Sequence, residues 1–162
     1  MFIPYELTRT DIGYQFITDS GLIYQLYLSE YYLLGEQGEE IVVNSFSFFN
    51  NTGDTRVRDP RIKATVLSYA LDYFNKNEGS GVVYICSPED NLARHRRIIF
   101  GKWYRETDTT IERHHCGKAF SDEGYYSSLL IRKNNPRKHE IIAAFHRHLD
   151  AMTVERYSSV DE

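Results

Sequence analysis

Alternating apolar and polar positions predict an antiparallel sheet in the first fifty residues. Residues 14–18 lead through the turn residues Asp19-Ser20-Gly21 into a second strand over residues 22–28. A third strand is predicted from Ile41 to about Phe49, after a loop rich in glycine and glutamate. Because successive side chains of a strand point to opposite faces, one face of the second strand would carry Leu22, Tyr24, Leu26 and Leu28.

Apolar residues at helical spacing, together with capping residues, predict three helices in the rest of the chain. Asp59-Pro60 would open the first helix, because aspartate caps free amides and proline suits the first helical position. The second helix is predicted at about residues 91–105. The third follows Asn134-Asn135-Pro136 and carries an apolar stripe made of Ile141, Ile142, Phe145, Leu149 and Met152.

Three more strands are predicted between these helices. The apolar run at residues 82–86 is typical of a central strand buried on both faces, and residues 109–116 and 125–132 form a closing pair. This order predicts an α+β fold, with a mostly antiparallel sheet, one parallel junction and helices packed on the sheet. We expect a single domain over residues 1–157 and a disordered tail at residues 158–162.

The composition agrees with a globular domain. The chain has 162 residues, of which 41% are hydrophobic and 26% charged, and this excludes a disordered, collagen-like or coiled-coil protein. The apolar runs are too short to span a bilayer, so we expect no membrane partner, and the N-terminus lacks a secretory pattern. Two cysteines do not make a disulfide framework, and we predict a cytoplasmic protein.

Charge is distributed unevenly along the chain. The formal net charge is −4, made of −7 in residues 1–90 (6 basic, 13 acidic) and +3 in residues 91–162 (13 basic, 10 acidic). Residues 92–105 contain five basic side chains and no acidic one. Such a stripe could attract an anionic partner, and the alternative is a solvated helix face paired with acids of the first half.

Three segments carry a resemblance to a known family. Residues 84–104, 59–65 and 126–134 together resemble a family of small bacterial proteins, mostly from Bacteroidota, that is known only as a domain of unknown function. The resemblance extends from about Tyr14 to Phe145. It implies no activity and no site residues.

The order of the predicted elements also resembles the core of the GCN5-related N-acetyltransferase (GNAT) fold. That resemblance implies that backbone amides before the first core helix hold the pyrophosphate of acetyl-CoA. Arg56 fits the leading residue of the family's phosphate-binding motif, whereas Asp59 and Arg61 stand where glycines are expected. Asp59 would place a carboxylate at the anion site, and Pro60 removes an N–H donor.

The second core helix differs from the acetyltransferase pattern as well. Asp90 stands at the expected asparagine, and Arg97 stands at the tyrosine that would protonate the leaving thiolate. Arginine stays protonated and is a poor general acid. Tyr104, two helical turns further on, is the candidate that remains for that role.

Histidine and cysteine residues form three further candidate pairs, and none of the patterns is complete. His114 and Cys116 would share one face of a strand, but no fourth-ligand pattern accompanies them, so we predict no metal site. His146 and His148 would not converge on one helix face, and we expect both to lie on the surface. Cys86, before a helix start, could act with His95 as a nucleophile, but a buried core cysteine is the commoner arrangement.

Three functional hypotheses follow. The first is a non-catalytic binding or accessory module without a cofactor, which recognises an anionic small molecule or an acidic protein surface. The second is a divergent acyl-CoA-dependent N-acyltransferase that uses acetyl-CoA. The third is nucleic-acid binding, which the net charge of −4 disfavours, and a homodimer is left open. The first hypothesis assigns ligand binding to Arg56, Arg58, Arg61, Arg94 and Arg97.

Overall fold

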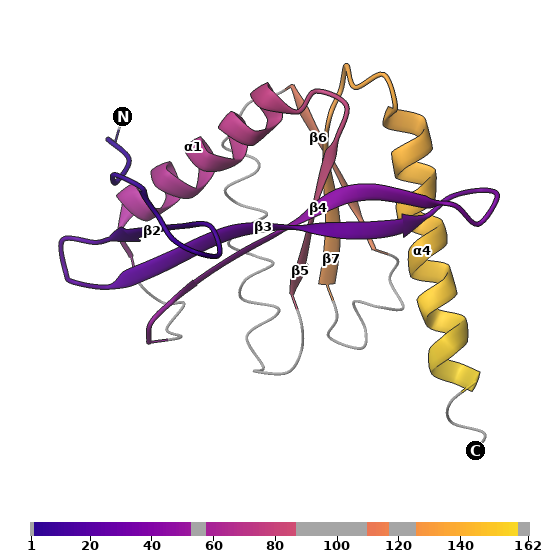
Figure 1. Ribbon diagram of the computed structural model, residues 1–162, viewed down its shortest axis with the longest axis horizontal. Helices are drawn as coiled ribbons and strands as arrows, with labels where there is room; N and C mark the ends of the chain where they lie inside the picture. Colours follow the sequence, from indigo (N-terminus) through magenta and orange to yellow (C-terminus); the bar gives the residue numbers. More distant parts are fainter. Residues whose placement is uncertain (1, 53–57, 87–109, 117–125, 159–162) are drawn as a thin grey trace.

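The computed structural model describes the chain except residues 1, 53–57, 87–109, 117–125 and 159–162, and Figure 1 shows its arrangement. Within the described residues, seven strands form one sheet that carries two helices, α1 (Pro60–Lys76) and α4 (Lys138–Ser158). The strands are β1 (Thr8–Arg9), β2 (Tyr14–Ile17), β3 (Ile23–Leu34), β4 (Glu40–Asn50), β5 (Gly81–Cys86), β6 (Ile111–His115) and β7 (Tyr126–Arg132).

The sheet has the order β1-β2-β3-β4-β5-β7-β6. Neighbouring strands are antiparallel, apart from the parallel pair β4–β5. The predicted α+β class, the mostly antiparallel sheet and the single parallel junction are therefore confirmed. The register of the parallel pair consists of two residue pairs, Asn44↔Val82 and Ser45↔Val83. Beyond these residues β4 and β5 separate (Figure 1).

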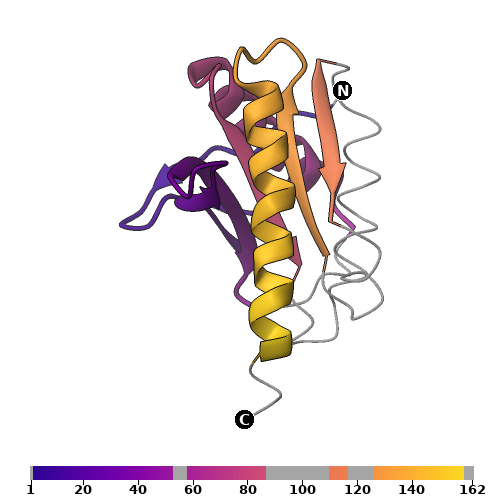
Figure 2. The same ribbon diagram turned by 90° about the vertical axis from the view of Figure 1, so that its right-hand side faces the viewer.

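The two helices lie on opposite faces of the sheet. α1 covers a core cluster that includes Phe16, Leu26 and Val66, whereas α4 covers one that includes Val83 and Phe145. Figure 1 shows the helices on either side of β5 and β7, and in Figure 2 α4 stands in front of these strands. Each helix therefore buries its apolar stripe against a different face, as amphipathic helices on a sheet must.

The long strands β3 and β4 change their buried face halfway along. Near its start, β3 buries Tyr24 and Leu26 under α1, and near its end it buries Leu33 under α4. Their cross-strand partners follow the same division, with Phe48 opposite Leu26 and Ile41 opposite Leu33. The sequence analysis ended this strand at residue 28, because the alternation breaks at residues 29–30 where the covering helix changes.

Apart from the longer strand β3, the predicted elements that fall on described residues are confirmed with small shifts of their bounds. The two-residue strand β1 was not predicted, and the third predicted helix begins at Lys138 and extends through Ser158, one residue beyond the predicted domain boundary. The predicted helix at residues 91–105 and residues 159–162 of the tail lie outside the described residues. No helix in the described part of the chain is long and apolar enough to cross a membrane.

Candidate functional site

The start of α1 is where the sequence analysis placed part of an anion site. Asp59 is the N-cap residue, and its Oδ1 accepts a hydrogen bond from the Arg61 amide at 2.9 Å. The Ile62 amide donates to the Asp59 carbonyl at 3.0 Å, and Pro60 has no amide proton. The first three helical positions therefore have no free N–H, and the carboxylate of Asp59 occupies the place that a bound phosphate would need.

A tyrosine from the N-terminal segment fixes this carboxylate. The Tyr5 hydroxyl donates to Asp59 Oδ2 at 2.6 Å and accepts from the Asp19 amide at 3.1 Å. The Tyr5 amide donates to Thr65 Oγ1 at 2.8 Å, and its ring stacks on Phe16 with 5.6 Å between centroids. Burial, followed by the hydrogen bond to Asp59, raises the pKa of Tyr5 above its ordinary value. Tyr5 therefore remains a neutral donor at neutral pH.

Arg61, one of the predicted ligand-binding arginines, is held within the protein. Its Nε donates to the Ile3 carbonyl at 2.9 Å, and its Nη1 lies 3.2 Å from Asp19 Oδ2. The guanidinium also lies 3.8 Å from the centroid of the Tyr5 ring, which is cation–π distance. These contacts position the guanidinium on the N-terminal segment, so it is not presented freely to a ligand.

The other predicted site residues are not brought together by the described structure. Arg58 is exposed and takes part in no hydrogen bond or ion pair within the part that the structure describes. Arg56, Arg94, Arg97 and the candidate acid Tyr104 lie outside the described residues. Of the five predicted arginines, Arg58 is thus the one whose described position leaves it available to a ligand.

An apolar cavity of about 60 Å³ lies between α1 and the sheet. Its walls come from α1 on one side and from β3, β4, β5, β6 and β7 on the other. The space would hold a few methyl groups, and an apolar lining of this kind favours an apolar guest over water. Among the lining side chains are Phe46, Val82 and Leu130 from the sheet and Val66, Ala70 and Tyr73 from α1.

A chain of polar groups closes the junction of β4 and β5 near this cavity. Asn44, on β4, donates through Nδ2 to the Tyr73 hydroxyl, which in turn donates to Ser80 Oγ at 2.9 Å. These bonds connect the parallel junction to the last turn of α1 and to the residue before β5. The sequence analysis missed both this chain and the Tyr5 network, because neither has a motif and both join residues far apart in the sequence.

His114 and Cys116, which were considered as metal ligands, make other contacts in the structure. His114 Nε2 lies 3.1 Å from Glu112 Oε2, and Glu112 Oε1 accepts from Lys138 Nζ at 2.9 Å. The hydrogen bond from Lys138, and to a smaller extent the one from His114, lowers the pKa of Glu112. Cys116 Sγ accepts a long hydrogen bond, 3.5 Å, from the Ser127 amide. No group of three or more possible metal ligands gathers among the residues that the structure describes.

Two remaining predictions are resolved only in part. The sequence analysis placed His148 on the surface with His146, but it is half-buried and its Nε2 lies 3.1 Å from the Tyr31 hydroxyl. That prediction was wrong for His148, because strand β3 reaches further along α4 than expected. Cys86 ends β5 as predicted, but its side chain and His95 lie outside the described residues.

Comparisons with known proteins assign the chain to a family and give it no function. No curated protein and no solved structure matches the chain, so the acetyltransferase resemblance and the bacterial origin remain predictions. Residues 58–147 match a family of unknown function, DUF6169, in a segment that begins just before α1 and ends within α4. This segment is more than half of the chain, and the chain therefore belongs to the DUF6169 family.

Proposed function

We propose that this protein is a non-catalytic binding module on an acetyltransferase-like scaffold, and that it recognises an acidic partner through arginine side chains. The observation that carries the proposal is the occupied start of α1. An acetyltransferase would need free amides there for the pyrophosphate of its cofactor, and Asp59 has taken those donors. Binding of an anion in this region must then come from side chains.

Arg58 supports this assignment because it stands next to the capped helix start, exposed and without a partner in the described structure. An exposed guanidinium can bind a carboxylate or phosphate in a bidentate manner. We include Arg56, Arg94 and Arg97 in the same proposed surface. Arg61 acts differently, since its contacts with Tyr5 and Asp19 make it a positioning residue for the N-terminal segment.

The proposal is tested by titrating a fluorescent peptide of six glutamates onto the wild type and Arg58→Glu. We expect at least a threefold loss of affinity at low salt, since an exposed ion pair is worth up to about 1 kcal/mol and reversal adds repulsion. The matched control is Lys133→Glu, which makes the same charge change at an exposed residue next to Arg132. Arg132 Nη1 donates to the Phe74 carbonyl near the other end of α1, about 25 Å from the helix start by helix rise. An equal loss in both variants would contradict a local site.

A second candidate function is favoured by a different observation. The separation of β4 and β5 after two residue pairs, together with the apolar cavity beside them, offers space for a chain-like ligand with an apolar end. We propose as the alternative a divergent acyl-CoA-dependent N-acyltransferase, in which Tyr104 would serve as the general acid. This alternative requires the cofactor to bind without the helix amides.

Thermal unfolding with millimolar acetyl-CoA separates the two functions. A ligand at 100 times its dissociation constant stabilises a protein by about 2.7 kcal/mol, which visibly raises the melting temperature. The binding-module proposal predicts no shift and no release of free CoA in the presence of a panel of amines. A clear shift together with CoA release would establish the acyltransferase instead.

A further inference from the structure

The outer arm of the β3–β4 ribbon, residues 30–44, has one face that neither helix covers in the described structure. The residue pairs Glu30↔Asn44, Tyr32↔Val42 and Leu34↔Glu40 lie along this face. Within the described residues α1 contacts this face at Asn44, through Tyr73, and α4 packs on the other face, where it covers Leu33 and Ile41. Tyr32 is therefore 46% exposed and Val42 is 44% exposed, side by side on adjacent strands. We call the surface formed by Glu30, Tyr32, Glu40 and Val42 the arm patch.

The charged side chains that belong to this arm are all of one sign. Residues 10–55 contain seven acidic side chains and no lysine or arginine. Within the part that the structure describes, no ion pair involves the four glutamates of the arm, which are Glu30, Glu36, Glu39 and Glu40. The Tyr32 hydroxyl donates to Glu30 Oε2 at 2.6 Å. That hydrogen bond, with the nearby charges of Glu30 and Glu40, raises the pKa of Tyr32.

The spacing of the arm patch defines the ligand it fits. Glu30 flanks the exposed Tyr32–Val42 pair at one end, and Glu40 flanks it at the other, opposite Leu34. The positions 30, 32 and 34 share one face of β3 and span about 13 Å at the rise of a strand. An extended peptide repeats this spacing, so its residues i, i+2 and i+4 would lie above the two acids and the apolar pair between them.

We propose that the arm patch docks an extended cationic segment of a protein partner, in which two basic side chains flank one apolar side chain at positions i, i+2 and i+4. The two basic side chains pair with Glu30 and Glu40, and the apolar side chain covers Tyr32 and Val42. A guanidinium over the Tyr32 ring adds a cation–π contact. This surface is separate from Arg58, which stands at the start of α1, and it selects the opposite charge and repels nucleic acid.

The probe is the peptide Arg-Ser-Leu-Ser-Arg with blocked ends and a fluorescent label. Its matched control is the peptide Arg-Arg-Leu-Ser-Ser, which has the same composition. This control cannot place one arginine on each side of the leucine on the same face of an extended chain. Both are titrated onto the full chain at low and at physiological salt. We expect the spaced peptide to bind at least fivefold more tightly than the control, because two exposed ion pairs and one apolar contact depend on the spacing.

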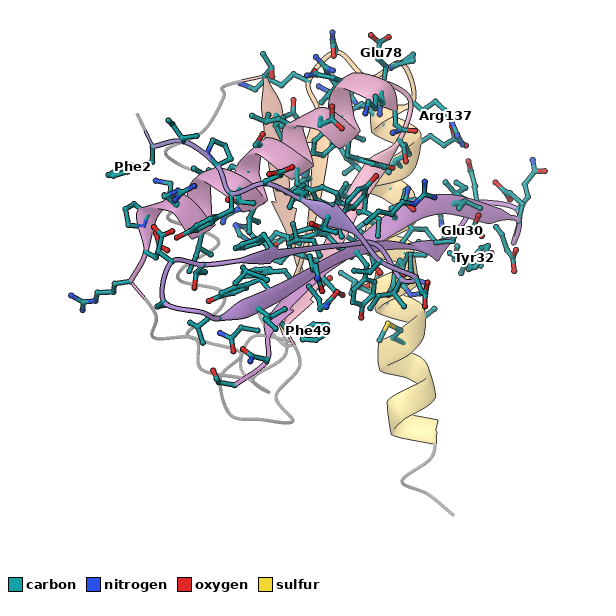
Figure 3. All side chains as sticks on the ribbon, turned by 60° about the vertical axis from the view of Figure 1, so that its left-hand side comes forward. Phe2, Glu30, Tyr32, Phe49, Glu78 and Arg137 are labelled. Carbon is teal, nitrogen blue, oxygen red and sulfur yellow. The ribbon has the colours of Figure 1, made fainter. Side chains whose placement is uncertain are left out.

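Variants of the protein locate the site. The double variant Glu30→Gln/Glu40→Gln should weaken binding of the spaced peptide about tenfold, and Tyr32→Ser should weaken it about threefold. The control Glu78→Gln removes one charge from the loop after α1, which Figure 3 shows well away from Glu30 and Tyr32, and should leave affinity within twofold. Equal binding of the two peptides, or an equal loss in the Glu78 variant, would overturn the proposal.

The same variants test whether the partner is another copy of this chain. Sedimentation at low salt should show a monomer that does not change on Glu30→Gln/Glu40→Gln. If the protein self-associates with rising concentration and the double variant does not, the partner of the arm patch is a second copy of this chain and not a segment of another protein. All variants change exposed side chains outside the core clusters, so thermal unfolding should be unaltered and a loss of binding cannot come from misfolding.

Discussion

The half of the sheet under α4 and the half under α1 are built from different side chains. The α4 half is mainly aliphatic, with Leu33, Val83 and Leu129 packed in the same cluster as the buried ring of Phe145. The α1 half is aromatic, and its stacked rings include Phe16 on Tyr24, with 5.0 Å between centroids. Aliphatic packing is non-directional and stabilises by burial alone, whereas buried tyrosines bring hydroxyls that need partners. The comparison teaches that the aromatic half can also orient neighbouring segments.

The largest expected effect tests the aliphatic half. Phe145→Ala removes a ring that is 1% exposed and should lower the free energy of unfolding by about 4 kcal/mol, because the cavity left behind cannot close. Urea denaturation at neutral pH measures the change. The control Phe49→Ala truncates a half-exposed ring on β4 and should cost less than about 1.5 kcal/mol. Equal costs would contradict the view that Phe145 is tightly packed in the core under α4.

A smaller effect is expected at Asp59, which orients the N-terminal segment against the aromatic half through Tyr5. Asp59→Ala removes the cap of α1 and the acceptor of the Tyr5 hydroxyl, and should cost about 2 kcal/mol. Asp59→Asn keeps a capping oxygen and should cost less than about 1 kcal/mol. Denaturation curves give both values. Resistance of residues 2–7 to proteolysis should fall in the alanine variant, and unchanged resistance would contradict the role of Asp59 in holding Tyr5.

The smallest effect concerns pH and the edge of the α4 half. The pKa of Glu112 is lowered in the folded state. Its hydrogen bonds to Lys138 and His114 therefore stabilise the protein at pH values above 4.5, the ordinary pKa of a glutamate. That contribution is lost as pH falls below 4.5 and through the folded pKa, where the carboxylate becomes protonated. Glu112→Gln should therefore flatten the fall of melting temperature that occurs as the pH is lowered below 4.5. A parallel shift of the whole curve would contradict this origin.

The fold could be predicted from the sequence for those helices and strands whose buried face stays the same along their whole length. Asp59-Pro60 marked the start of α1, and the apolar run of β5 marked a strand buried on both faces. β3 was cut short because its pattern reverses where cover passes from α1 to α4. A single alternation rule cannot follow such a reversal, since it assumes one buried face for each strand.

The candidate site was less predictable, because its contacts are tertiary. Arg61 looked available from its sequence, and only the folded chain brings Ile3, Tyr5 and Asp19 to it. The neighbouring sequence was enough to predict that Asp59 caps α1. It was not enough to predict the hydrogen bond to Tyr5, which is 54 positions away. Local chemistry therefore identified the helix start, and long-range packing decided what that start can bind.

The reversal in the β3–β4 ribbon links the two cores into one cooperative unit. Ser29 and Ser45 face each other at the reversal and share a hydrogen bond of 2.8 Å, with one core on each side along the ribbon. Neither core can come apart without releasing strands that the other also uses. Backbone amides at this crossing should therefore exchange with deuterated water only when the whole domain opens, while those of the two-residue strand β1 exchange through local fraying.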